Sequence, residues 1–351
     1  MSLHLHWTTA LIEADVKLEI DLRRDVWRYV SRRTAQAAVV IALTYTFVFF
    51  VLFILPGDPI RQQIENPQNP LPAADAAVLI QYYNLDQSAL KQFVIAVERL
   101  LHGDWGYSLT TSKPVSALIA QAIPQTLALA STALLLSILL SLAIALLAVF
   151  SPWPTLRAGF ESLPAVLLST PSFLVGVLLL QIFSFWLGWV SSIRDEGFKS
   201  VILPATALAL AVSAPIAQVL IQGFQKNYQE PFINILRAKG LGESTIIFRH
   251  VLKNSAIPAL TLLGLTVGEL LAGSVITETI FSRTGIGFLT QQAVREQDTP
   301  VILAVVALVA TVFVLIVLLT DLLYPLIDPR IALYRRPLAK EAAHGLSLIH
   351  I

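Results

Sequence analysis

The residues best suited to a chemical task lie between positions 230 and 258, a polar island between two long apolar runs. The first part of the island mixes apolar and basic side chains, namely Phe232, Ile235, Leu236, Arg237 and Lys239. Gly240 follows, and a glycine commonly ends a helix because it tolerates left-handed backbone angles. A second part restarts at Glu243 and runs to Pro258, whose ring we expect to end it. The pattern predicts a short exposed helix, a turn and a second helix. Its basic amphipathic surface suits either an acidic partner protein or lipid headgroups, and the pattern alone leaves both open.

The sequence lacks the residue sets that most enzymes and metal proteins need. It contains no H-E-x-x-H, G-x-S-x-G or G-x-x-x-x-G-K-[ST] run, so the chain does not hydrolyse ATP by itself. There is no cysteine, and no other histidine stands at metal-ligand spacing from His250. The net charge of +1 argues against nucleic acid as a partner. We therefore expect no enzyme activity, no metal site and no cofactor in this chain.

One acidic residue, Glu269, stands inside an apolar run. A carboxylate at mid-depth in a bilayer is costly unless it is paired, protonated or wetted by a cavity. One hypothesis is that Glu269 lines a path for cationic or amine-bearing solutes, and the alternative is a protonated carboxyl hydrogen-bonded between helices. Gly264 and Gly268 in the same run have the spacing that lets two helix backbones approach closely. Glu278 is expected to reach the membrane interface.

The composition predicts that these residues are positioned by membrane-spanning helices. Hydrophobic residues make up 56% of the 351 positions and charged residues 13%, with a mean hydropathy of +0.71. Each crossing requires about 20 mainly apolar residues in a helix. Six runs meet that condition, near 35–55, 124–150, 164–190, 201–222, 257–280 and 300–327. Pro204 and Pro215 interrupt the fourth run. The predicted fold is an all-α integral membrane protein with six transmembrane helices.

The distribution of basic residues predicts the orientation. Six crossings place both termini on one side, and the flanks on that side hold 16 of the 24 Lys and Arg residues. Because basic flanks stay in the cytosol, we expect the N-terminus and C-terminus to be cytoplasmic. The predicted organisation is a cytoplasmic segment 1–34, a transmembrane domain 35–327 and a cytoplasmic tail 328–351. The domain includes an external insert at 56–123 and a cytoplasmic coupling segment at 223–256.

The external insert combines a proline-rich loop with a helical stretch. From Ala73 to Leu101 the apolar residues follow helical spacing, and we expect them to pack on the spans, with a docked external protein as the alternative. The loop acids Asp58, Asp86 and Asp104 are candidates for contacts with an external protein, although solvated loop acids are common.

Several short motifs together resemble one family. In the island the matching residues are Arg237, Ala238, Lys239, Gly240 and Leu241, then Arg249, His250, Leu252, Asn254, Ile257 and Pro258. Elsewhere they are Pro56-Gly57-Asp58-Pro59, Gly103-Asp104-Trp105-Gly106-Tyr107-Ser108, Pro171-Ser172-Phe173-Leu174-Val175-Gly176, Leu203-Pro204-Ala205, Gly273-Ser274-Val275, Glu278-Thr279-Ile280-Phe281-Ser282, Gly285-Ile286-Gly287 and Asp328-Pro329-Arg330. Their order and spacing resemble permease subunits of binding-protein-dependent ATP-binding-cassette importers, in the dipeptide, oligopeptide and nickel branch.

The sequence departs from the family pattern at three places. The usual Glu-Ala-Ala at the start of the cytoplasmic motif is replaced by Asn234, Ile235 and Leu236. Arg283-Thr284 replaces a pair that ends in proline, and Glu269 stands where the family is usually apolar. The resemblance therefore leaves the substrate and the gating open.

The resemblance implies a subunit of the bacterial cytoplasmic membrane that imports short peptides, or nickel or another metal chelate, by alternating access. Its partners would be a second similar permease, two ATPase subunits that hold ATP and magnesium, an external solute-binding protein and membrane lipid. The residues implied to contact the ATPase are Pro231, Phe232, Asn234, Ile235, Leu236, Arg237, Ala238, Lys239, Gly240 and Leu241. Of these, the apolar side chains would anchor in a cleft and the two basic ones would meet acidic groups. The competing classes are a self-sufficient secondary transporter, which only Glu269 supports, and a membrane enzyme.

Overall fold

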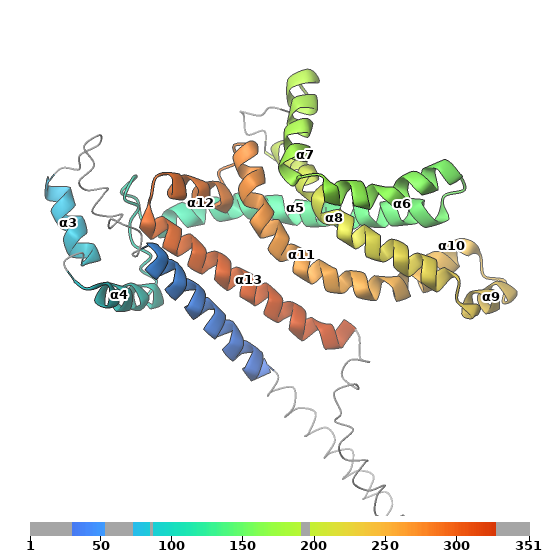
Figure 1. The fold of residues 1–351 in the computed structure, drawn as a ribbon, viewed down its shortest axis with the longest axis horizontal. Helices are drawn as coiled ribbons and strands as arrows, with labels where there is room; N and C mark the ends of the chain where they lie inside the picture. The colour runs from blue at the N-terminus through green and yellow to red at the C-terminus, as the bar shows by residue number, and fades with distance from the viewer. Residues whose placement is uncertain (1–29, 53–72, 85–86, 191–196, 328–351) are drawn as a thin grey trace, which may run out of the picture.

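The computed structural model describes residues 30–52, 73–84, 87–190 and 197–327, and the regular elements in these ranges are helices. Within them, five helices are long and apolar enough to cross a membrane: Val30–Leu52, Val115–Phe150 (α5), Lys199–Tyr228 (α8), Glu243–Ile280 and Thr299–Thr320. A bent helix pair makes a sixth candidate if it counts as one span. Figure 1 shows these helices gathered in one elongated bundle. The predicted all-α membrane fold is confirmed.

The bent pair replaces the straight third span that we expected at 164–190. Here α6 (Pro154–Ser169) is followed by α7 (Ser172–Leu179) and a π-helical turn (Leu180–Trp186), at an angle of 105°. Pro171 explains the break, because a residue that precedes proline avoids helical angles, and Thr170 is extended with ψ 122°. In Figure 1, α6 lies beside α5 and α8, whereas α7 turns away from the bundle.

The fourth predicted span is a single helix despite its prolines. Pro204 and Pro215 both lie inside the 30-residue α8. Proline is tolerated within membrane helices because neighbouring helices, side chains and local adjustments satisfy the freed carbonyl groups. Fully buried alanines such as Ala133 and Ala145 of α5 and Ala209 of α8 fit the packed helices at the centre of the bundle. Small residues of this kind allow close helix contact in membranes.

The polar island folds as predicted at its start but not at its end. Its elements are α9 (Pro231–Ala238), α10 (Glu243–Thr245), a π-helical turn (Ile246–Val251) and α11 (Leu252–Ile280). The expectation that the second helix ends at Pro258 is wrong, because α11 continues through that residue. As in α8, one lost backbone hydrogen bond does not end a helix that is held by its neighbours.

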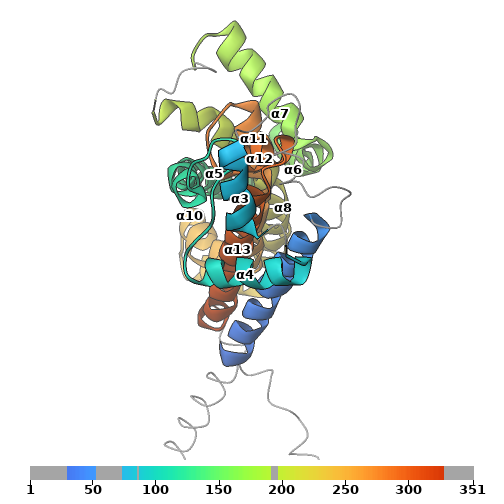
Figure 2. The ribbon, with the colours of Figure 1, turned by 90° about the vertical axis from the view of Figure 1, so that its left-hand side faces the viewer.

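Four helices form the other end of the bundle, opposite the island. They are α3 (Ala73–Tyr83), α4 (Ala89–Leu101), α12 (Ile286–Arg295) and the start of α13 (Thr299–Ile327). Figure 2 shows α4 lying across the bundle rather than along it. Phe93 of α4 packs against Phe49 and Phe50 at ring distances of 5.2 and 5.4 Å, so part of the apolar stripe covers a span as predicted. Another part, Leu90, Val94 and Leu101, stays exposed.

Gly264 and Gly268 of α11 bring this helix close to α13, as their spacing predicts. A Cβ atom at Gly264 would collide with the side chain of Thr320, and one at Gly268 would collide with the ring of Phe313. The absence of these Cβ atoms therefore sets the distance between the two helices.

We predict that Gly264→Ala lowers the stability of the purified protein by about 1–3 kcal/mol, the usual cost of overpacking. Thr320 is β-branched and has little freedom to move aside. The matched control is Gly159→Ala in α6, where nothing lies within 4 Å and better helix propensity should stabilise the chain by up to about 1 kcal/mol. Thermal unfolding in detergent measures both, and equal midpoints for the two variants would contradict the packing role of Gly264.

Candidate functional site

The helix α9 and its turn lie at one end of the bundle, far from α3, α4 and α12 at the other end (Figure 1). Glu230 is extended and Pro231 occupies the first helical turn, where its missing N–H is not needed. Gly240 ends the helix with φ +78°, a conformation that side-chain-bearing residues adopt at a cost. The end of α9 at Gly240 is as the sequence analysis predicts, and Pro231 fixes its start.

The side chains of α9 divide into an inner and an outer set. Ile233, which the sequence analysis passed over, is 1% exposed and belongs to the main core. Phe232 and Leu236 are half-buried and pack against the same core. Ile235 remains 58% exposed, beside exposed Asn234. The helix is therefore anchored from within by Ile233 and offers Ile235 as its outward apolar residue.

Arg237 has a partner in its own chain. Its Nε donates to the carboxylate of Glu243 at 2.7 Å, and the guanidinium lies 5.1 Å from the ring centre of Tyr228. Tyr228 also donates from its hydroxyl to Glu243 at 2.9 Å. The hydrogen bond to Glu243 raises the pKa of Arg237, so the pair stays charged. This cluster ties the end of α8, α9 and the start of α10 together. The exposed Lys239 makes no ion pair within the described ranges.

Glu269 lies near the middle of α11 on a face that the described part of the chain does not cover. It is exposed, and so are Leu265 and Ile276, which are 60% and 47% exposed on the same side of the helix. A carboxylate in this position would be unfavourable against lipid tails. The face therefore requires water or another protein subunit as its neighbour.

Of the three acids proposed for external contacts, only one can be placed. Asp58 and Asp86 lie outside the described residues. Asp104 is exposed, and its carboxylate accepts hydrogen bonds from the Tyr82 hydroxyl at 2.7 and 2.8 Å and from the Gly106 N–H at 3.0 Å. It holds the loop after α4, and its role in docking stays a prediction.

The sequence analysis missed a buried carboxylate at the junction of α5, α11 and α12. The expectation that Glu278 reaches the interface is wrong, because its exposure is 0%. Thr126 of α5 donates to Glu278 at 2.7 Å, and the N–H of Phe288 donates to it at 3.0 Å. Thr126 in turn accepts from the N–H of Ile286 at 2.7 Å. The backbone N–H groups of Ile286 and Phe288 thus attach α12 to α5 and α11, and the bond from Thr126 to Glu278 joins α5 to α11.

The sequence pattern that could have predicted this site is the motif Gly285-Ile286-Gly287. A Cβ atom at Gly285 would overlap the carboxylate of Glu278, and one at Gly287 would overlap the backbone of Val275. The two glycines are thus required for the close approach of a backbone to a buried acid. A glycine pair seven and nine residues after a glutamate in an apolar run can be searched for in a sequence.

A second buried acid fixes the loop after α4. Asp298 is 2% exposed and accepts hydrogen bonds from the hydroxyl groups of Ser108 and Thr110 and from the N–H of Leu109. Because Asp298 precedes α13, these bonds attach the loop at Ser108–Thr110 to the turn between α12 and α13. No group of three His, Cys, Asp or Glu residues suited to a metal ion occurs among the described residues.

Five helices that are long and apolar enough to cross a membrane, packed in one bundle, define a multi-pass membrane protein. The chain belongs to the family described as "binding-protein-dependent transport system inner membrane component", which matches residues 138–333. It is therefore an importer permease subunit of the ATP-binding-cassette class and a multi-pass protein of the cytoplasmic membrane. Family membership implies ATPase and solute-binding partners.

Two relatives illustrate the likeness. The glutathione transport system permease protein GsiC of Salmonella choleraesuis (strain SC-B67) is 35% identical over 308 residues, covering 86% of this chain and 98% of the relative. GsiC of Escherichia coli (strain K12) is 33% identical over 308 residues, with the same coverage of both chains. Among solved structures, the inward-facing MetNI methionine ABC transporter is 16% identical with a TM-score of 0.49, covering 62% of this chain and 100% of that chain.

We predict that Thr126→Val destabilises the protein by about 1–3 kcal/mol, because it leaves the buried N–H of Ile286 without a partner and removes a donor from Glu278. The control is Thr206→Val in α8, whose hydroxyl bonds only to a carbonyl of its own helix, and which should cost less than about 0.5 kcal/mol. Unfolding midpoints in detergent test this. A Thr126 variant as stable as the Thr206 variant would show that the cluster contributes nothing.

Proposed function

We propose that this chain forms half of the membrane pathway of an importer for di- and oligopeptides. An external solute-binding protein would deliver the peptide, and two ATPase subunits, with ATP and magnesium bound to them, would drive alternating access. The observation that carries the peptide assignment is the likeness over 98% of the length of a relative named for glutathione transport, since glutathione is a tripeptide. A nickel or metal-chelate cargo fits the same architecture and is the alternative.

The geometry of α9 supports its role as the contact with an ATPase subunit. A helix that transmits movement must be stiff and must expose groups that a partner can hold. Ile233 fixes α9 from within, and the cluster of Arg237, Glu243 and Tyr228 fixes the turn. Ile235 and Lys239 are then the outward apolar and basic groups. The other residues in the proposed contact are Pro231, Phe232, Asn234, Leu236, Ala238, Gly240 and Leu241.

The location of α9 also fits the orientation proposed from the basic residues. If both termini are cytoplasmic, α9 faces the cytosol and α3, α4 and α12 face outward. The ATPase contact and the receptor-facing insert then lie at opposite ends of the bundle, as Figure 1 allows. A helix that runs from Glu243 to Ile280 spans most of the distance between them.

The exposed face of α11 supports a pathway shared with a second permease. Because Glu269 is unfavourable against lipid, a second subunit placed there would shield it and leave a polar cavity between the two chains. An acid in that cavity favours peptides with a free amine. A self-sufficient secondary transporter would place more charged groups along such a path, and Glu269 alone supports it.

We predict that Ile235→Asp reduces co-purification with the ATPase subunits by about tenfold or more, since it replaces an apolar anchor by a charge. ATP-driven uptake should fall with it. The matched control is Val294→Asp in α12, an apolar residue 57% exposed at the opposite end of the bundle, which should leave ATPase binding unchanged. Equal ATPase recovery from both variants would argue against α9 as the contact, and uptake by the chain alone would favour the secondary transporter.

Uptake of labelled peptides into vesicles that contain the assembled importer tests the cargo. We expect uptake of di- and tripeptides that depends on ATP, and uptake of nickel chelates alone would overturn the peptide assignment. In Glu269→Gln, uptake of amine-bearing peptides should fall by about fivefold relative to N-acetylated ones, the equivalent of roughly 1 kcal/mol of charge interaction. If every substrate enters the variant at the wild-type rate, Glu269 does not line the pathway.

A further inference from the structure

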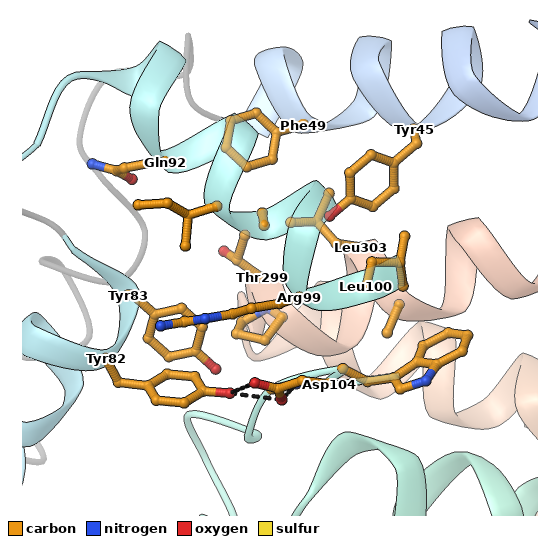
Figure 3. Close-up of a pocket in the computed structure, with 16 residues that line it drawn as sticks. Tyr45, Phe49, Tyr82, Tyr83, Gln92, Arg99, Leu100, Asp104, Thr299 and Leu303 are labelled. Carbon is orange, nitrogen blue, oxygen red and sulfur yellow. Dashed lines mark hydrogen bonds between the residues drawn. The ribbon is translucent and has the colours of Figure 1, made fainter. Parts of the chain in front are cut away.

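A pocket lies at the outward end of the bundle, where α4 crosses the ends of two spans. Figure 3 shows it between the helix Val30–Leu52, α3, α4 and the start of α13. Its volume is about 80 Å³, room for roughly five to eight water-sized groups. Aromatic side chains form much of its wall, namely Tyr45, Phe49, Tyr82, Tyr83 and Trp105. The pocket is thus too small for a peptide of several residues but fits a compact polar group.

The pocket contains one cation and one anion that do not neutralise each other. Arg99 of α4 lies over the ring of Tyr82, 4.1 Å from its centre, and Asp104 accepts from the hydroxyl of the same tyrosine. In the described part of the chain no ion pair joins the two, and no hydrogen bond uses the N–H groups of Arg99. Tyr82 therefore keeps a positive and a negative group apart within one pocket.

Tyr82 and the loop hold this arrangement in place. Burial and the hydrogen bond to Asp104 raise the pKa of Tyr82 to about 12, so the phenol remains a donor at physiological pH. Tyr83 accepts from the N–H of Tyr107 at 3.0 Å and donates to its carbonyl at 2.7 Å. The charged groups are thus preorganised before any ligand arrives, which lowers the cost of binding.

The surroundings of the pocket are suited to lipid. Leu90, Val94 and Leu101 of α4 are 68%, 61% and 80% exposed, and Leu43 and Phe47 of the adjacent span are 63% and 70% exposed. A helix that lies across the ends of membrane spans with exposed apolar residues is at the depth of the headgroups. Tyrosine and tryptophan, which line the pocket, favour the same depth.

We propose that this pocket binds the headgroup of a zwitterionic phospholipid with a primary ammonium group. The guanidinium of Arg99 has free N–H donors for two phosphate oxygens, a geometry in which arginine is superior to lysine. The ammonium group donates to the remaining acceptor positions of Asp104. The acyl chains lie along the exposed residues of α4 and the span Val30–Leu52. This site is independent of the cargo that the importer carries.

The test measures lipid retention by the purified full-length chain with native mass spectrometry. The chain is exchanged in detergent against phosphatidylethanolamine, phosphatidylcholine or phosphatidylglycerol. We expect retention of phosphatidylethanolamine about tenfold above the other two, because choline has no N–H to donate and glycerol has no positive charge. Arg99→Gln should lower retention by about tenfold. Asp104→Asn should remove the preference for ethanolamine over choline. Because asparagine is isosteric with aspartate, this variant still tests the proposal if the Arg99 variant does not fold.

Two controls on the same helix separate the pocket from general charge effects. Lys91→Gln and Glu98→Gln make the same charge changes at exposed positions outside the pocket, and both should leave retention unchanged. Equal retention of the three lipids, or an Arg99 variant that behaves like the Lys91 variant, overturns the proposal. It is also overturned if Arg99→Gln and Asp104→Asn weaken binding of the solute-binding protein while lipid retention stays unchanged, because the pocket then serves docking.

Discussion

Lipid offers the backbone no hydrogen-bond partner, and this constraint governs both the regular and the irregular parts of the structure. It keeps α5, α8 and α11 helical through Pro124, Pro204, Pro215 and Pro258, since a helix with one missing bond is better than an exposed loop. Where the backbone is not helical, side chains must supply the missing hydrogen-bond partners. Where the chain breaks between α11 and α12, a buried carboxylate and a threonine supply partners for the N–H groups of Ile286 and Phe288. At this break, side chains therefore satisfy the irregular backbone.

Side-chain hydrogen bonds to other elements lie at both ends of one long helix. The helix Glu243–Ile280 is tied by Arg237 and Tyr228 at its start and by Thr126 and α12 near its end. Because the bonds at each end join different elements, a displacement of α9 cannot be absorbed in a loose turn. It must move the helix Glu243–Ile280 as a body or bend it at the π-helical turn Ile246–Val251. The proposed transmission from an ATPase subunit to the pathway needs this stiffness.

The spans were predictable because hydropathy and length can be read directly from the sequence. The end of α9 was predictable from Gly240. The bend at Pro171 carried a sequence signal, but the length of the apolar run at 164–190 outweighed it. The partners of Glu278, Asp298 and Arg237 were not predictable in this way. Each pairs with a residue on another element or across a turn, and the pairing depends on how the helices pack. The aromatic pocket is likewise assembled from four separate segments.

Two glutamates on α11 show how packing determines whether a carboxylate is buried or exposed. Glu269 and Glu278 are nine residues apart, and at about 100° per residue they point to opposite sides of the helix. Glu278 faces the bundle and each of its carboxylate oxygens accepts a hydrogen bond there, whereas Glu269 faces away and is exposed. The chain thus satisfies one acid by itself and leaves the other to a neighbour that is not part of it. Against lipid tails that face would be unfavourable, so Glu269 requires water or another protein subunit as its neighbour, and the second permease that we propose would shield it from the lipid.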